Sequence, residues 1–104
     1  MSLRWSQRAL RDLDQIWAFI AQDNPRAARR WVHQIQARAR AATTAPLAGR
    51  VVPEVGLPEI REVFQRSYRV VYRVEGDELY VLTVFEGHQR FPHHAMPDEV
   101  DGAD

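Results

Sequence analysis

Hydrophobic and polar residues alternate along two stretches in the second half of the chain. From Tyr68 to Glu75 they follow the two-residue period of a half-buried strand, and residues 78–85 repeat it. Gly76-Asp77 supplies the positive φ that a two-residue hairpin turn needs. A short apolar stretch at 61–65 predicts a third strand, joined through Arg66-Ser67, so the pattern predicts a three-stranded meander. The residues expected on one side of the last strand are Leu79, Val81, Thr83 and Phe85.

The first half of the chain shows helical periodicity instead. Ser6 suits an N-cap, and Asn24 with Pro25 ends one helix near Gln22 and begins the next. So short a connection predicts an antiparallel helical hairpin, and residues 1–5 predict a short strand that joins the sheet. The expected buried residues are Ala9, Leu10, Leu13, Ile16, Trp17 and Ile20 in the first helix, and Ala28, Trp31, Val32, Ile35, Ala39 and Ala42 in the second.

Residues 43–60 connect the two halves and contain three prolines and two glycines, which predicts a long ordered loop. The element order is therefore strand, two helices, loop and three strands (β-α-α-β-β-β). This order predicts an α+β fold in which the helical hairpin packs on one face of an antiparallel sheet.

Composition restricts the chemistry. The chain has 104 residues and no cysteine, and all fourteen basic residues are arginine, which excludes disulfides, thiolate catalysis, Schiff bases and a Walker-type phosphate loop. We see no leader and no apolar run long enough to cross a membrane, so we expect a cytoplasmic protein.

The fourteen acidic residues balance the arginines overall but not locally. Four of them follow Arg90, so residues 1–94 carry 14 − 10 = +4. We expect one domain at 1–94 and an acidic, disordered tail at 95–104. The arginines of the second helix could contact DNA, although a basic helix face is more often simply solvated.

Several residues are candidates for function. Arg61 and Arg69 could bind phosphate or a carboxylate, although strand arginines often pair with local acids such as Glu62. Phe19 stands off the main apolar stripe of its helix, so we expect it to be partly exposed and available to a partner. His88 follows the last strand, and Glu54 in the loop is a possible base. Because His93 and His94 lack further ligands, we expect neither a metal nor another cofactor.

Four pieces of the chain resemble the RelE/ParE toxin superfamily of type II toxin–antitoxin systems, and its ParE-like branch most closely. They occur in the family's order over about residues 3–92 and are DLDQIWAFIAQDNPRAA (12–28), PLAGR with VPE (46–50 and 52–54), REV (61–63) and YRVVYRV (68–74). The resemblance implies a toxin that inhibits DNA gyrase without being an enzyme. It also implies that a cognate antitoxin neutralises the toxin. The toxin would then be connected to DNA only indirectly, through this antitoxin.

The superfamily also contains RelE-like, ribosome-dependent messenger-RNA endonucleases, which form the alternative interpretation. Such an enzyme needs acid–base groups and cations around the ribose and phosphate, and the available set is Arg61, Arg69, His88 and Arg90. If the protein is instead a gyrase inhibitor, Arg61, Arg69 and Arg90 would form the target-binding surface and Phe19 would contact the antitoxin.

Overall fold

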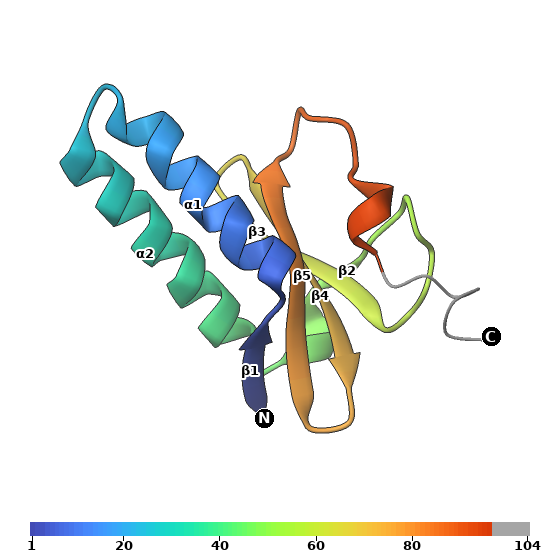
Figure 1. The fold of residues 1–104 in the computed structure, drawn as a ribbon. Coiled ribbons are helices and arrows are strands. Elements are labelled where there is room, and N and C mark those ends of the chain that lie inside the picture. The colour runs from blue at the N-terminus through green and yellow to red at the C-terminus, as the bar shows by residue number, and fades with distance from the viewer. Residues whose placement is uncertain (97–104) are drawn as a thin grey trace.

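A computed structural model describes residues 1–96 of the chain. Figure 1 shows two helices on one side of a twisted sheet, which confirms the predicted α+β class. The elements are β1 (Ser2–Trp5), α1 (Gln7–Ala21), α2 (Pro25–Ala42), β2 (Arg50–Val51), β3 (Ile60–Gln65), β4 (Tyr68–Glu75) and β5 (Glu78–Glu86), with two 3-10 turns, η1 (Pro46–Ala48) and η2 (His93–Ala95).

The five strands lie in the order β1-β5-β4-β3-β2. The predicted meander β3-β4-β5 is antiparallel throughout, and β1 joins the same sheet as expected. However, β1 runs parallel to β5, so the sheet is mixed and not wholly antiparallel. Within the expected loop, the two-residue strand β2 pairs with β3 and forms the opposite edge of the sheet.

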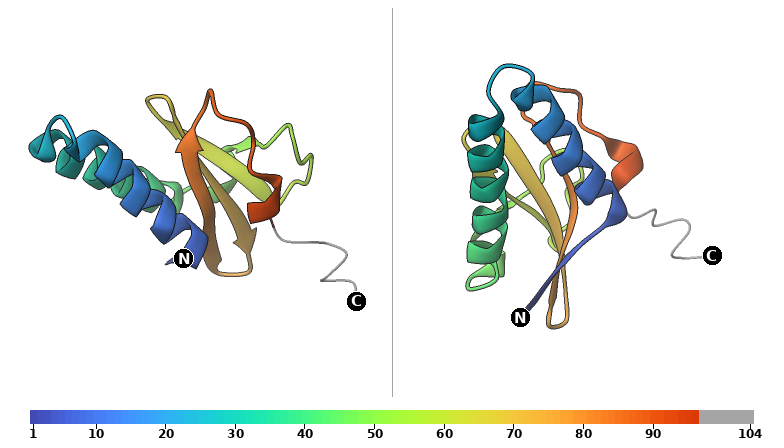
Figure 2. Two further views of the ribbon diagram at one scale, coloured as in Figure 1. Left: turned by 45° about the horizontal axis from the view of Figure 1, so that its top comes forward. Right: turned by 60° about the vertical axis from the view of Figure 1, so that its left-hand side comes forward.

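The helix caps occur where the sequence predicts them. The Ser6 hydroxyl accepts a hydrogen bond from the Ala9 amide at 2.9 Å, and Asn24 Oδ1 accepts one from the Ala27 amide at 3.0 Å. Each cap satisfies an amide at the helix start that has no partner within the helix. The hairpin of α1 and α2 crosses one face of the sheet, with α1 against β5 and α2 against β3 (Figure 2).

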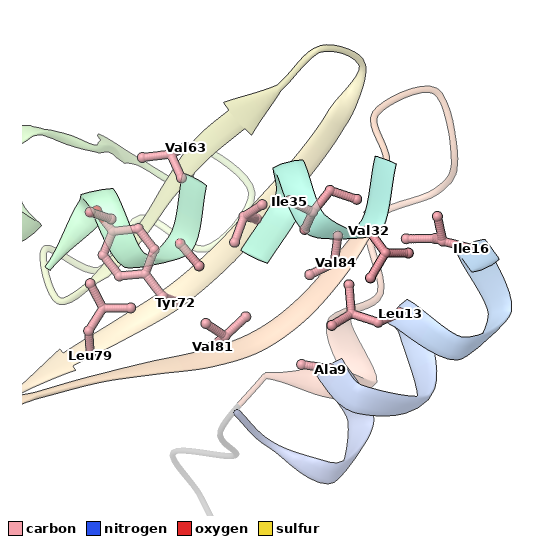
Figure 3. Packing of buried hydrophobic residues seen from close by; sticks show 13 residues of the cluster. Ala9, Leu13, Ile16, Val32, Ile35, Val63, Tyr72, Leu79, Val81 and Val84 are labelled. Atoms are coloured by element: carbon pink, nitrogen blue, oxygen red, sulfur yellow. The ribbon is translucent and has the colours of Figure 1, made fainter. Parts of the chain in front are cut away.

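Between the helices and the sheet lies the larger apolar core (Figure 3). Ile35 of α2 and Tyr72 of β4 are completely buried in it. The expectation that both tryptophans of the helices are core residues is wrong, since Trp17 is 39% exposed and Trp31 is only half-buried. Leu10, also expected inside, is exposed. The apolar residues at helical spacing form a wide stripe on each helix, and only the centre of the stripe contacts the sheet. Residues at the edge of the stripe are therefore left partly exposed.

A β-bulge in β5 changes which residues share a face. Val71 pairs with Thr83 and Tyr72 with Val81, so Leu82 is an extra residue in the ladder. Beyond the bulge the alternation shifts, and Phe85 packs in a second apolar cluster apart from Leu79 and Val81. The expectation that Phe85 shares their face is therefore wrong, because strict alternation fails where one strand carries an additional residue.

Both hairpin turns use a residue with positive φ. Gly76 has φ +56°, as the sequence predicts, and Arg66 has φ +54°, which is uncommon for a residue with a side chain. The Arg66 guanidinium carbon lies 5.4 Å from the centre of the Trp31 ring, so a cation–π contact holds this turn against α2.

Ala95 ends η2 and Met96 packs against the second apolar cluster. The rest of the predicted tail lies outside the described residues. No helix within residues 1–96 combines the length and the apolar character that crossing a membrane requires.

Candidate functional site

Arg69 lies on the sheet face opposite the helices and is enclosed by acids. Its Nε donates to Glu62 Oε1 at 2.6 Å, and its two terminal nitrogens donate to the carboxylate of Glu54 at 2.8 Å each. The guanidinium carbon also lies 5.1 Å from the ring centre of Phe85 and 5.4 Å from that of Phe91. Every nitrogen of this guanidinium therefore has an internal partner, and the side chain is only 8% exposed.

The surrounding charges form an alternating chain. Glu62, which is completely buried, also accepts hydrogen bonds from the more exposed Arg50, whose Nε lies 2.9 Å from Glu62 Oε2. The hydrogen bonds from Arg69 lower the pKa of Glu54 to about 2 despite its partial burial, and they also raise the pKa of Arg69. Two arginines and two glutamates thus neutralise one another, and Glu54 is poorly suited to act as a base near neutral pH.

Arg61 has a different internal role. Its Nε donates to the Pro58 carbonyl at 2.6 Å, and its Nη1 donates to the carbonyls of Leu47 and Gly49 at 2.9 and 3.1 Å. These bonds tie the 43–60 segment to β3. The Tyr72 hydroxyl reinforces this attachment by donating to the Pro46 carbonyl at 2.6 Å.

The three arginines expected to converge do not do so. Arg61 pairs with Tyr72 across β3 and β4, whereas Arg69 pairs with Phe64. Directly paired residues share a face, and positions 61 and 64 are an odd number of residues apart, so Arg61 and Arg69 point to opposite faces. Arg90 lines a groove to which neither of the other two belongs.

This groove, the α1 groove, has a volume of about 730 Å³. It lies between α1 and the segment that follows β5, which runs back beside the helix (Figure 2). Phe19, 71% exposed, is the most exposed of the large apolar side chains among residues 1–96 and lines the groove, in accord with its expected exposure. The groove combines aromatic and charged side chains: Arg8, Phe19, Tyr68, Phe85, His88, Arg90 and Phe91 are among those that line it.

His88 lies at the rim of the α1 groove beside Glu86. Its Nδ1 is 2.7 Å from Glu86 Oε2, and its backbone amide donates to the other carboxylate oxygen. This pairing raises the pKa of His88 and lowers that of Glu86. Burial and the nearby Glu86 raise the pKa of Tyr68. Residues 1–96 contain no cluster of three or more side chains suited to hold a metal ion.

Comparison with known proteins identifies the family. Residues 3–91 match the family model described as ParE toxin of the type II toxin–antitoxin system parDE. The chain belongs to the ParE toxin family. A Sinorhizobium fredii protein named "Putative toxin Y4kP" is 37% identical over 92 residues, which cover 86% of this chain and 92% of the relative.

Two solved structures of ParE-related proteins are similar in fold to this chain. The chromosomal ParDE toxin–antitoxin system from P. aeruginosa contains a chain with a TM-score of 0.68 and 25% identity, covering 83% of this chain and 95% of its own length. The YoeB/ParE toxin from Agrobacterium tumefaciens has a TM-score of 0.60 at 22% identity, covering 83% and 98%, and is similar in fold.

One residue of this ParE toxin that sequence reasoning missed is Asp12, which lies in the floor of the α1 groove. It is buried and accepts hydrogen bonds from Thr83 Oγ1 at 2.6 Å, the Val84 amide at 3.0 Å and Arg8 Nε at 3.1 Å. Asp12 thereby fastens α1 to β5. The i,i+4 spacing from Arg8 was the available signal, although such pairs usually lie on the surface.

Proposed function

We propose that this ParE-family toxin inhibits DNA gyrase by binding, without an enzymatic step, and that a cognate antitoxin neutralises it in the cytoplasm. Membership of the ParE family supports the toxin role. One observation favours binding over RNA cleavage: Arg61 and Arg69 lie on opposite faces of the sheet, and the guanidinium group of each donates hydrogen bonds to internal partners. A phosphorane-stabilising site would need such cations free and directed at one point.

For the antitoxin, the α1 groove is the surface we propose. An amphipathic helix could cover Phe19 with an apolar side chain and place acids near Arg8 and Arg90 at the groove rim. Aromatic anchors and arginines are the residue types that contribute most to such interfaces. The antitoxin would be encoded immediately upstream and would fold on contact.

One observation supports the endonuclease alternative. His88, Glu86, Arg90 and Tyr68 all line the α1 groove, which brings an acid–base pair, a cation and an aromatic ring together. A ribonuclease could use His88 for proton transfer and Arg90 for charge stabilisation.

The deciding experiment induces the toxin alone and follows plasmid supercoiling, DNA breaks and protein synthesis in the same cells. We expect loss of supercoiling and broken DNA before translation stops, and we expect purified toxin to inhibit gyrase until the upstream gene product is added. His88→Ala should retain this inhibition. Cleavage of messenger RNA at the ribosomal A site, abolished by His88→Ala, would establish the endonuclease instead.

A further inference from the structure

The outward face of α2 is the most one-sided charge distribution on the helices of this protein. The helix contains five arginines and no acidic residue. At about 100° per residue, four of these arginines and a histidine fall within an arc of roughly 100° centred opposite the buried stripe. This basic face consists of Arg26, Arg29, Arg30, His33 and Arg40. Together with Gln34 and Ala37 these residues line a shallow depression with a volume of about 510 Å³.

The basic face has no internal partner within the described part of the chain. The side chains of its four arginines make no hydrogen bond or ion pair with residues 1–96, whereas Arg4, Arg8, Arg50, Arg69 and Arg73 all pair with acids. Its four arginines are therefore exposed cations for which residues 1–96 supply no counter-charge.

Its placement is unfavourable for the isolated helix. Arg26 lies in the first turn, where the helix dipole favours acids, and that turn contains none. Arg26 also stands four positions before Arg30 and three before Arg29, spacings at which like charges repel. Both effects destabilise α2 in the free protein, and an external anion would relieve them.

We propose that the basic face of α2 binds the phosphate backbone of duplex DNA. From Arg26 to Arg40 it extends about 21 Å, the length of about six base pairs of duplex. Backbone recognition needs only positive charge, and Ala37 is the single apolar side chain among the described residues that line this face. An acidic amphipathic helix would find no apolar anchor here, in contrast to the α1 groove, with which the face shares no residue.

The choice of DNA over RNA rests on the proposed function, because gyrase acts on duplex DNA. A toxin that holds both gyrase and its DNA segment would gain from two weak contacts acting together. This contact is direct, and differs from the expectation that the protein reaches DNA only through its antitoxin.

The test measures binding of the full chain to a fluorescent 20-base-pair DNA duplex by anisotropy across 50–200 mM NaCl, without gyrase. We expect micromolar binding at low salt and a log–log salt slope of about −3 to −4, as for three or four neutralised phosphates. The double variant Arg26→Gln/Arg30→Gln should bind at least about tenfold more weakly with a slope shallower by about 2.

The matched control is Arg4→Gln/Arg11→Gln, which removes the same charge from exposed positions outside α2 and should bind DNA nearly as well as the parent. A Tm of the α2 variant at or above that of the parent would show that its loss of binding is not unfolding.

Equal weakening by both double variants would overturn the proposal, because net charge alone would then account for binding. Tighter binding to an RNA duplex, or to poly-glutamate, would overturn it in favour of those partners. Gyrase inhibition without DNA binding would also overturn it and leave the proposed function intact. DNA binding without gyrase inhibition would support the DNA-binding face and overturn the proposed function.

Discussion

Arg69 and Glu62, on the neighbouring strands β4 and β3, form an ion pair in which neither side chain is exposed to more than a trace of solvent. The pair lies under Phe85 and Phe91 and connects through Glu54 to the 43–60 segment. Burying charges is costly unless each is paired and hydrogen-bonded, and here every partner is present. The network therefore holds together the sheet face opposite α1 and α2.

We expect Arg69→Met to lower the free energy of unfolding by about 3 kcal/mol, because the change leaves Glu62 buried with only Arg50 as partner. Urea denaturation followed by circular dichroism would measure this. The control is Arg50→Met, whose side chain is 55% exposed and which should cost about 1 kcal/mol or less. Equal losses in the two variants would contradict the assignment of Arg69 as the central residue.

Glu54 should make stability depend on pH in the acid range. Its folded pKa of about 2 lies below the ordinary value of 4.5, so the folded state binds fewer protons there than the unfolded chain. The contribution of Glu54 is present in full above about pH 4.5 and is lost as pH falls toward 2. Partial exposure limits it to about 1 kcal/mol.

The measurement compares urea midpoints of the parent and Glu54→Gln between pH 3 and pH 7. The two midpoints should differ most at pH 6–7 and approach each other below pH 4. Glu59→Gln, a change of an exposed acid in the same loop, is the control and should stay within about 0.5 kcal/mol of the parent at pH 7. A constant difference at every pH would refute the role of ionised Glu54.

Asp12→Ala should destabilise the protein by about 2–3 kcal/mol, because the Val84 amide and the Thr83 hydroxyl lose a buried acceptor. Asp12→Asn keeps one carbonyl oxygen and should cost less. Hydrogen exchange of the Val84 amide should accelerate in the alanine variant. Asp14→Asn changes an exposed acid on the same helix and should stay within about 0.5 kcal/mol of the parent; an equal loss there would refute a specific role for Asp12.

Phe19→Ala should separate binding from stability. The exposed ring contributes little to folding, so thermal melting should show a free energy of unfolding within about 0.5 kcal/mol of the parent. Affinity for the antitoxin should fall by about 30-fold or more, as for an interface hot spot. Titration calorimetry with the upstream gene product would measure it, with Trp17→Ala, an exposed aromatic that does not line the groove, as control. Unchanged affinity would remove Phe19 from the interface.

Local features of this fold could be predicted from the sequence because short-range physics determines them. Ser6 and Asn24 cap helices through bonds to amides three residues away, and Gly76 supplies a φ that side chains disfavour. The two-residue period of β4 likewise separates Val70 from Val71 across the sheet. The exposure of Phe19 followed from the same reasoning on a helix.

The tertiary structure decided which charges meet. The two-residue turn at Arg66-Ser67 sets the register of β3 against β4 and so places Arg61 and Arg69 on opposite faces, but the partners that each finds there come from segments distant in sequence. The bulge at Leu82 moves Phe85 to the face where it covers Arg69, and packing of α1 on β5 buries Asp12 beside Thr83, 71 positions away. Bulges and long-range pairing depend on contacts between distant segments, and therefore only the folded chain shows that Arg61 and Arg69 have internal partners.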